Sequence, residues 1–76
     1  MYVTFSARVF GGMPVEVEAY IASAEPDVGL ARPYVDDMQV MFPNGRPFTP
    51  KLYNKISKKE WEELEERAIE EYYEYR

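Results

Sequence analysis

Apolar and polar residues alternate twice within the first 22 positions of the chain. The apolar members of the two runs are Val3, Phe5, Ala7, Val9 and then Val15, Val17, Ala19, Ile21. An alternation with a period of two is typical of a strand that buries one face. The pattern therefore predicts an antiparallel hairpin with strands over about residues 2–10 and 14–22.

The register of this hairpin is restricted, because directly opposed residues must share a face of the sheet. A three-residue loop over positions 11–13 meets the condition, and a five-residue loop would also fit. The three-residue loop sets Val9 opposite Val15 on the apolar side and Arg8 opposite Glu16 on the polar side, and either loop leaves one face apolar and the other polar. We therefore expect a sheet that is covered on one face only.

A third strand is predicted over residues 36–42, where Met38, Val40 and Phe42 share one face. The turn PNGRP follows it, and the Asn-Gly pair leaves room for a short fourth strand near residues 46–48. Residues 23–34 contain two prolines and a glycine, which indicates a loop. Such a loop is either a plain connection or a binding segment.

Two helix starts can be recognised in the second half of the chain. Thr49 before Pro50 has the form of an N-cap followed by proline, which predicts one short helical turn over about residues 50–55. The motif SKKE from Ser57 to Glu60 has the form of a capping box. It predicts a long helix over about residues 58–75.

Apolar residues around this capping box indicate how the long helix packs. Ile56 and Trp61 occupy the two positions of a hydrophobic staple. Spacings of three and four residues then define the expected buried stripe, which comprises Trp61, Leu64, Ala68, Tyr72 and Tyr75. Together the elements predict a single α+β domain, in which a three-stranded or four-stranded antiparallel sheet is covered on one face by the C-terminal helix.

Composition excludes several classes of function. The chain has no cysteine and no histidine, so disulfides, thiolate nucleophiles and zinc sites built on cysteine are excluded. A net charge of −5 argues against direct binding to nucleic acid or to an anionic membrane. No run approaches the ~20 apolar residues of a membrane span, and the first ten residues lack the pattern of a signal peptide. We expect a cytoplasmic protein without a cofactor.

Two pairs of carboxylates are the only candidates for catalysis or metal binding. Glu16 and Glu18 share the polar face of the expected hairpin, and Asp36 and Asp37 are adjacent. No glycine-rich phosphate loop or nucleophile–base pair accompanies them. We therefore expect no enzymatic activity and no metal site.

The long helix carries a row of acids with a period of four, consisting of Glu62, Glu66, Glu70 and Glu74. Neighbours in this row are separated by a rise of about 6 Å and repel each other. One interpretation is a solvated face that keeps a small protein soluble. The other is a docking surface for a protein with a basic patch, with Tyr73 adding contact area because it falls outside the buried stripe.

A more specific form of the docking hypothesis is mimicry of DNA, in which the acid row blocks a nucleic-acid-binding or defence enzyme. DNA carries one charge per ~3.4 Å on each strand, whereas the row carries one per ~6 Å. Because the charge density of the row is about half that of a DNA strand, an ordinary protein-interaction module is the main hypothesis and DNA mimicry is the alternative.

The order of a hairpin, a third strand closed by the NGRP turn and a terminal EWEELEERA helix resembles small uncharacterised accessory proteins of tailed bacteriophages. The resemblance implies a non-enzymatic protein that acts on a host protein in the bacterial cytoplasm, for example as an inhibitor. It supplies no functional residues. A homodimer is compatible with the predicted sheet, because its edge strand is unpaired.

Overall fold

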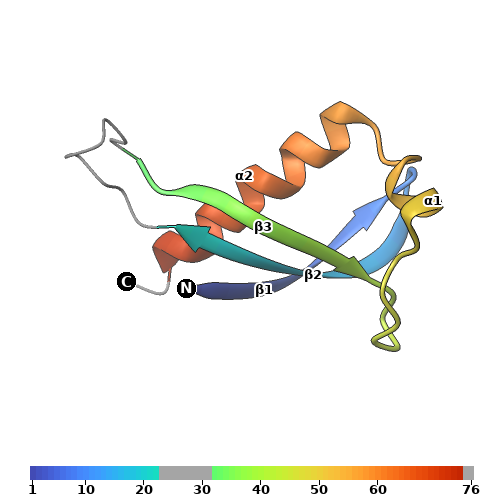
Figure 1. Ribbon diagram of the computed structural model, residues 1–76, viewed down its shortest axis with the longest axis horizontal. Coiled ribbons are helices and arrows are strands. Elements are labelled where there is room, and N and C mark those ends of the chain that lie inside the picture. The colour runs from blue at the N-terminus through green and yellow to red at the C-terminus, as the bar shows by residue number, and fades with distance from the viewer. Residues whose placement is uncertain (23–31, 75–76) are drawn as a thin grey trace.

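The computed structural model describes residues 1–22 and 32–74 of the chain. Within these residues the chain forms, in order, the strands β1 (Tyr2–Val9), β2 (Met13–Ala22) and β3 (Tyr34–Met41) and the helices α1 (Pro50–Tyr53) and α2 (Lys58–Glu74). The strands form one antiparallel sheet in the order β1-β2-β3, and α2 crosses one face of it (Figure 1). The structure confirms the predicted α+β class.

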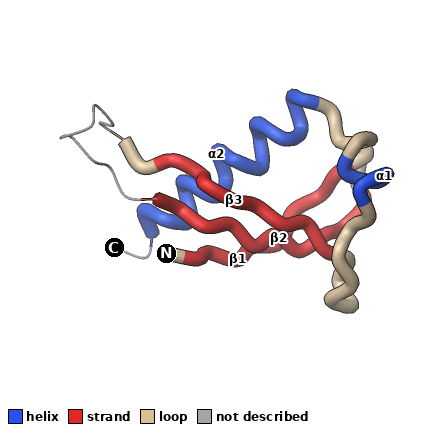
Figure 2. Tube along the Cα trace, in the orientation of Figure 1, coloured by secondary structure: helices blue, strands red, loops and turns tan. Residues whose placement is uncertain are grey.

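The core lies between α2 and the sheet (Figure 2). Alternate residues of the strands are buried, as their sequence pattern predicts, and α2 contributes Leu64 and Ala68 from one side of the helix. Phe48 and Ile56, which precede and follow α1, close the core at one end. The opposite face of the sheet is open, so the prediction of a sheet covered on one side is confirmed.

The register of the hairpin differs from the prediction by two residues. Val9 pairs with Met13 instead of Val15, and Arg8 pairs with Pro14 instead of Glu16. The loop therefore comprises residues 10–12 and not residues 11–13. The faces of the two strands are unchanged by this correction, because a shift of two residues preserves the alternation.

The shift has its cause in Phe10, the first residue of the loop. Phe10 has a φ of 55°, in the left-handed region that residues other than glycine rarely adopt. Two tertiary contacts compensate for this conformation. The Phe10 N–H donates to Glu60 Oε2 at 2.7 Å, and the ring stacks on Phe48 with 6.3 Å between the ring centroids. Both partners are distant in sequence, so a pattern based on the two glycines alone misplaces the loop.

Strand β3 starts at Tyr34, two residues before the predicted position, because a β-bulge extends its pairing with β2. Tyr20 pairs with Asp37, whereas the next residue, Ile21, pairs with Val35. Asp36 is therefore the additional residue of the bulge. The bulge keeps Val35 packed against the core.

The expected fourth strand near residues 46–48 is reduced to a single bridge between Met41 and Pro47. Proline has no N–H to donate to a longer ladder. The turn is nevertheless closed, because the N–H of Phe42 donates to the carbonyl of Arg46 at 2.8 Å and the N–H of Phe48 donates to the carbonyl of Val40 at 3.0 Å. Within the described residues, the sheet has three strands.

Helix α1 has the predicted N-cap and ends at Tyr53, two residues before the predicted end. Thr49 Oγ1 accepts a hydrogen bond from the N–H of Leu52 at 3.3 Å, and Pro50 is the first helical residue. The helix places the Tyr53 hydroxyl against β3. The hydroxyl accepts from the N–H of Val40 at 2.9 Å and donates to the carbonyl of the same residue at 3.3 Å.

The capping box of α2 forms as the sequence predicts. Ser57 Oγ accepts from the N–H of Glu60 at 3.1 Å, and the Glu60 carboxylate accepts from the N–H of Ser57 at 3.4 Å. Trp61 and Tyr72 are only half-buried, so the buried residues of the predicted stripe are Leu64 and Ala68 at its centre. Tyr75 and most of the predicted 23–34 loop lie outside the described residues.

Candidate protein-binding surface on helix α2

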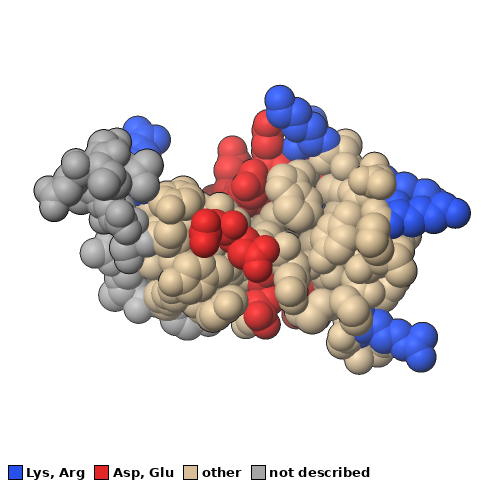
Figure 3. Space-filling model, in the orientation of Figure 1, with Lys and Arg blue, Asp and Glu red and all other residues tan. Residues whose placement is uncertain are grey.

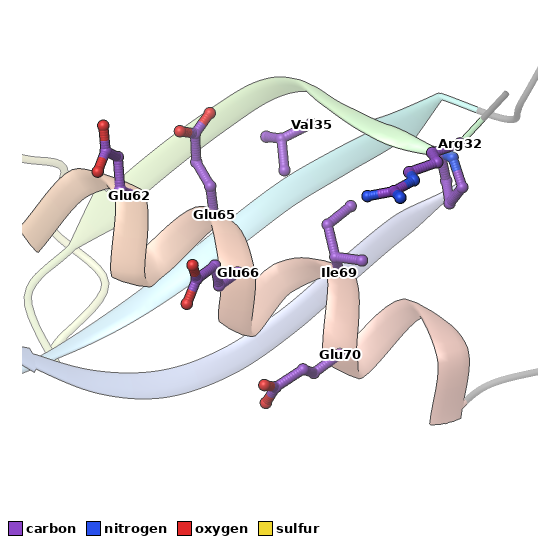
Figure 4. Close-up of a pocket in the computed structure, with 8 residues that line it drawn as sticks. Arg32, Val35, Glu62, Glu65, Glu66, Ile69 and Glu70 are labelled. Carbon is purple, nitrogen blue, oxygen red and sulfur yellow. The ribbon is translucent and has the colours of Figure 1, made fainter. Parts of the chain in front are cut away.

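A shallow hollow of about 530 Å³ lies between α2 and the start of β3 (Figure 4). Strand and helix contribute to it in different ways, since the strand side supplies a cation and apolar groups and the helix side supplies mostly carboxylates. Its lining residues are Arg32, Pro33, Val35, Glu62, Glu65, Glu66, Ile69 and Glu70. The hollow therefore combines an apolar floor with an acidic rim.

The floor of the hollow consists of Val35 and Ile69, which are both half-buried and packed against the core. The Ile69 side chain points from α2 toward β3, and the Arg32 guanidinium extends toward it from the strand side (Figure 4). Val35 reaches the hollow because the bulge at Asp36 sets the register in which the first residues of β3 pair with β2. The floor is thus a consequence of sheet geometry and helix packing together.

The acidic rim is poorly neutralised. Among the described residues, Glu62 lies 4.0 Å from Lys58, and both side chains are exposed. An exposed pair at this distance contributes little attraction. Within the same part of the chain, no ion pair involves Glu66 or Glu70. The well-formed ion pair of α2, Arg67 Nε to Glu71 Oε1 at 3.0 Å, does not line the hollow.

The predicted binding residues are distributed along one side of α2. Glu62, Glu66 and Glu70 all line the hollow. Glu74 lies in the last turn of the helix and is exposed, beyond the residues that line the hollow. Tyr73 is 51% exposed, and its ring packs on that of Tyr72 with 5.6 Å between the centroids. The structure thus gives the acid row and Tyr73 access to solvent.

Five other residues of the hollow are absent from the predicted binding residues, namely Arg32, Pro33, Val35, Glu65 and Ile69. Glu65 is missed because the prediction follows a strict period of four, although a spacing of three from Glu62 also places two residues on one helix face. Ile69 follows Glu65 at a spacing of four. Arg32 and Val35 are missed because they precede the predicted strand, and the pairing that extends β3 depends on Ile21 in another strand.

The open face of the sheet carries Glu16, Glu18 and Asp37 together with Tyr2 and Tyr20. Acidic side chains cross the middle of the molecule in a band, whereas lysines and arginines project at the margins (Figure 3). Glu16 accepts a hydrogen bond from the Ser6 hydroxyl at 2.7 Å, and Asp37 accepts one from the N–H of Met38 at 2.9 Å. The rings of Tyr2 and Tyr20 meet edge to face, with 5.0 Å between centroids. The carboxylates of Glu16 and Asp37 therefore each accept a hydrogen bond from a neighbouring residue of the sheet.

Comparisons with protein-family models, with curated proteins and with solved structures gave no match. In the described part of the chain, neither helix has the length and apolar character needed to cross a membrane.

Proposed function

We propose that this protein is a small acidic interaction module without enzymatic activity, which binds a protein with a basic surface through α2. The observation that carries the proposal is the combination found in the hollow beside β3. Glu66 and Glu70 have no ion-pair partner in the described residues, and they line the same hollow as the apolar residues Val35 and Ile69. Charge attracts and orients a basic partner, while apolar contact provides affinity.

The chemistry of the partner follows from this combination. A lysine or arginine carries an aliphatic stem and a charged head group. Such a side chain can lay its stem over Ile69 and direct its head group to the carboxylates of the rim. Glu65 and Glu66 precede Ile69 by four and three residues, so they lie on its face of the helix and can accept hydrogen bonds from this head group. Arg32 at the strand end opposes the entry of cations there, so it favours an approach from the helix side.

Tyr73 extends the proposed surface beyond the hollow. Its exposed ring lies one helical turn after Ile69 and next to Glu74. Tyrosine provides a large contact area and a hydroxyl group, and it is enriched among the residues that dominate interfaces. The resemblance to phage accessory proteins adds that the partner is a protein of the bacterial cytoplasm.

Affinity capture tests the proposal. The immobilised protein is exposed to bacterial lysate, and the captured proteins are identified by mass spectrometry. The captured partner is then titrated with Glu66→Gln/Glu70→Gln and with the control Glu18→Gln/Asp36→Asn, which removes the same number of charges from residues outside the hollow. We expect slower association and a weaker salt dependence for the first variant only, because attraction to a basic patch acts mainly on the association rate.

Equal binding of both double variants at low salt would contradict the proposal and leave the acid row as a solubility device. Competition with DNA distinguishes DNA mimicry from an ordinary protein interaction. A target that DNA displaces from the protein would support mimicry of a nucleic-acid-binding enzyme, whereas an ordinary partner is retained. Loss of binding with Tyr73→Ala alone would instead place the interface at the end of α2.

A further inference from the structure

Strand β1 forms one edge of the sheet. The bonds of Met1, the residue before it, show which residues of β1 are hydrogen-bonded to β2. The N–H of Ile21 donates to the carbonyl of Met1 at 2.8 Å, and the Met1 ammonium donates to the carbonyl of Ile21 at 3.2 Å. Met1 and Ile21 are thus a hydrogen-bonded pair, in which each residue donates to the carbonyl of the other. Because bonded and non-bonded pairs alternate along an antiparallel ladder, odd residues of β1 bond to β2. Even residues direct their N–H and C=O groups away from the sheet.

The outward-facing residues of β1 are Tyr2, Thr4, Ser6 and Arg8. Within residues 1–22 and 32–74, no hydrogen bond reaches their backbone groups from outside the strand. The strand contains no proline and no lysine, and its pairing with β2 has no bulge. Proteins commonly use these devices to prevent pairing at an exposed edge. The β1 edge therefore presents a regular row of unpaired donors and acceptors.

The opposite edge, formed by β3, is closed by contrast. Both backbone groups of Val40 are bonded to the Tyr53 hydroxyl, and the Val40 carbonyl also accepts from Phe48. The N–H of Met38 is bonded to a carboxylate oxygen of Asp37 at 2.9 Å. A bulge at the start of the strand interrupts the remaining edge. The fold thus blocks one edge with side chains and leaves the other available.

We propose that the β1 edge pairs with β1 of a second copy of this chain, antiparallel and about a two-fold axis, to give a continuous six-stranded sheet. Outward-facing residues must pair with one another, so even positions face even positions. The register that uses the whole edge sets Tyr2 opposite Arg8 of the second copy and Thr4 opposite Ser6 of the second copy. It forms about eight backbone hydrogen bonds across the axis.

Side chains on both faces of β1 suit this register. On the open face, the guanidinium of Arg8 comes next to the exposed ring of Tyr2, which favours a cation–π contact. On the helix face, Phe5 meets its own copy, and Val3 faces the half-buried Ala7. The second copy would cover the part of Ala7 that is exposed in a single chain. A strand with this sequence is therefore complementary to itself.

Helix α2 carries a cation close to the proposed axis, which passes through Phe5. The Arg67 guanidinium lies 5.5 Å from the centroid of the Phe5 ring, so two arginines approach each other in the dimer. Each of them donates through Nε to its own Glu71 at 3.0 Å, which balances its charge. Repulsion across the axis is consequently small, and the acid row beside β3 remains exposed for another partner.

Sedimentation and amide hydrogen exchange by NMR test the proposal on the intact chain. We expect a concentration-dependent rise from 8.9 kDa to twice that mass. In the same range, the amides of Thr4 and Ser6 should become protected, whereas those of Phe5 and Ala7 are protected at every concentration by β2. Thr4→Pro removes one outward N–H and should give a monomer. Thr4→Val keeps that N–H and should remain a dimer.

Three results would overturn the proposal. The first is a monomer at all concentrations with rapid exchange of Thr4 and Ser6. The second is a dimer in which these amides still exchange rapidly, since another surface would then mediate association. The third is a monomer whose Thr4 and Ser6 amides become protected only when a captured protein is added, because the edge would then accept a foreign strand. Hydrogen exchange on the unmodified protein keeps the proposal testable if Thr4→Pro fails to fold.

Discussion

A single hydroxyl group, that of Tyr53, satisfies two backbone groups at the edge of β3. It accepts from the N–H of Val40 at 2.9 Å and donates to the carbonyl of Val40 at 3.3 Å. The ring is held edge to face against Phe48 on one side and Trp61 on the other, with centroid distances of 5.9 and 6.2 Å. The residue thus joins α1 to the sheet and blocks further pairing at this edge.

Replacement of Tyr53 by phenylalanine tests this role. The ring contacts are kept, but the N–H of Val40 loses its partner in a partly buried place, which costs about 1 to 3 kcal/mol. Urea unfolding measures the change in free energy. Tyr73→Phe is the control, because the side chain is largely exposed, and it should change stability by less than about 0.5 kcal/mol. Equal stability of the two variants would show that water replaces the hydroxyl of Tyr53.

At the scale of elements, the start of α2 is tied to the β1–β2 hairpin through Glu60. One oxygen of its carboxylate accepts from the N–H and the hydroxyl of Ser57, at 3.4 and 3.3 Å. The other oxygen accepts from the N–H of Phe10 at 2.7 Å. A carboxylate in the first helical turn is also favoured by the helix dipole. One side chain therefore stabilises both the helix start and the unusual conformation of the hairpin loop.

We expect Glu60→Ala to cost more than Ser57→Ala. Loss of the serine removes one capping interaction, worth roughly 0.5 to 2 kcal/mol. Loss of the glutamate side chain removes the bonds that it accepts from Ser57 and from the N–H of Phe10, and a hydrogen bond to a charged group is worth about 1.5 to 3 kcal/mol. Thermal unfolding of both variants and of the control Glu63→Ala, an exposed acid of the same turn, measures the difference. Equal losses for Ser57→Ala and Glu60→Ala would contradict a structural role of the bond to Phe10.

The sequence predicts those elements whose signals are local. The N-cap bonds of the helices join residues three positions apart, and the strand alternation is visible within each strand, so the helix starts and the buried faces are correctly predicted. The hairpin register is wrong by two residues because Glu60 and Phe48 decide the conformation of Phe10 from a distance. The start of β3 is missed for the same reason, since Ile21 determines the pairing of Val35.

The candidate site is only partly predictable. A period of four identifies Glu62, Glu66 and Glu70 as members of one helix face, and all of them line the hollow. The sequence does not reveal that this face borders the start of β3, because that depends on how α2 crosses the sheet. The apolar floor and Arg32 therefore emerge only from the packed structure (Figure 4).

At the scale of the whole molecule, the charges and the open backbone groups occupy different sides. The acid row lies on the side of α2 that borders β3, whereas the unpaired edge belongs to β1 at the other side of the sheet. Helix α2 packs more extensively on β1 than on β3, which leaves the hollow between α2 and β3 uncovered. Self-association through β1 and binding of a basic partner through α2 are therefore mutually compatible.

The uncompensated acid row also makes the stability of the molecule sensitive to salt. Replacement of Glu62, Glu66, Glu70 and Glu74 by glutamine removes four charges and takes the net charge from −5 to −1. Repulsion along the row disappears, at a gain of about 0.2 to 0.5 kcal/mol for each neighbouring pair, while the weak pair of Glu62 with Lys58 is lost. The variant should therefore be as stable as the wild type or more stable at low ionic strength.

Salt provides an independent check that repulsion along the acid row causes the difference in stability, because ions screen repulsion between exposed charges at these distances. Added NaCl should raise the unfolding temperature of the wild type and have a smaller effect on the glutamine variant, so that the two converge at high salt. The control is Glu71→Gln, which breaks the close ion pair with Arg67 and should lower the unfolding temperature at low salt. A quadruple variant that is less stable than the wild type at low salt would mean that these glutamates make favourable contacts, and the row would then no longer be free to attract a partner.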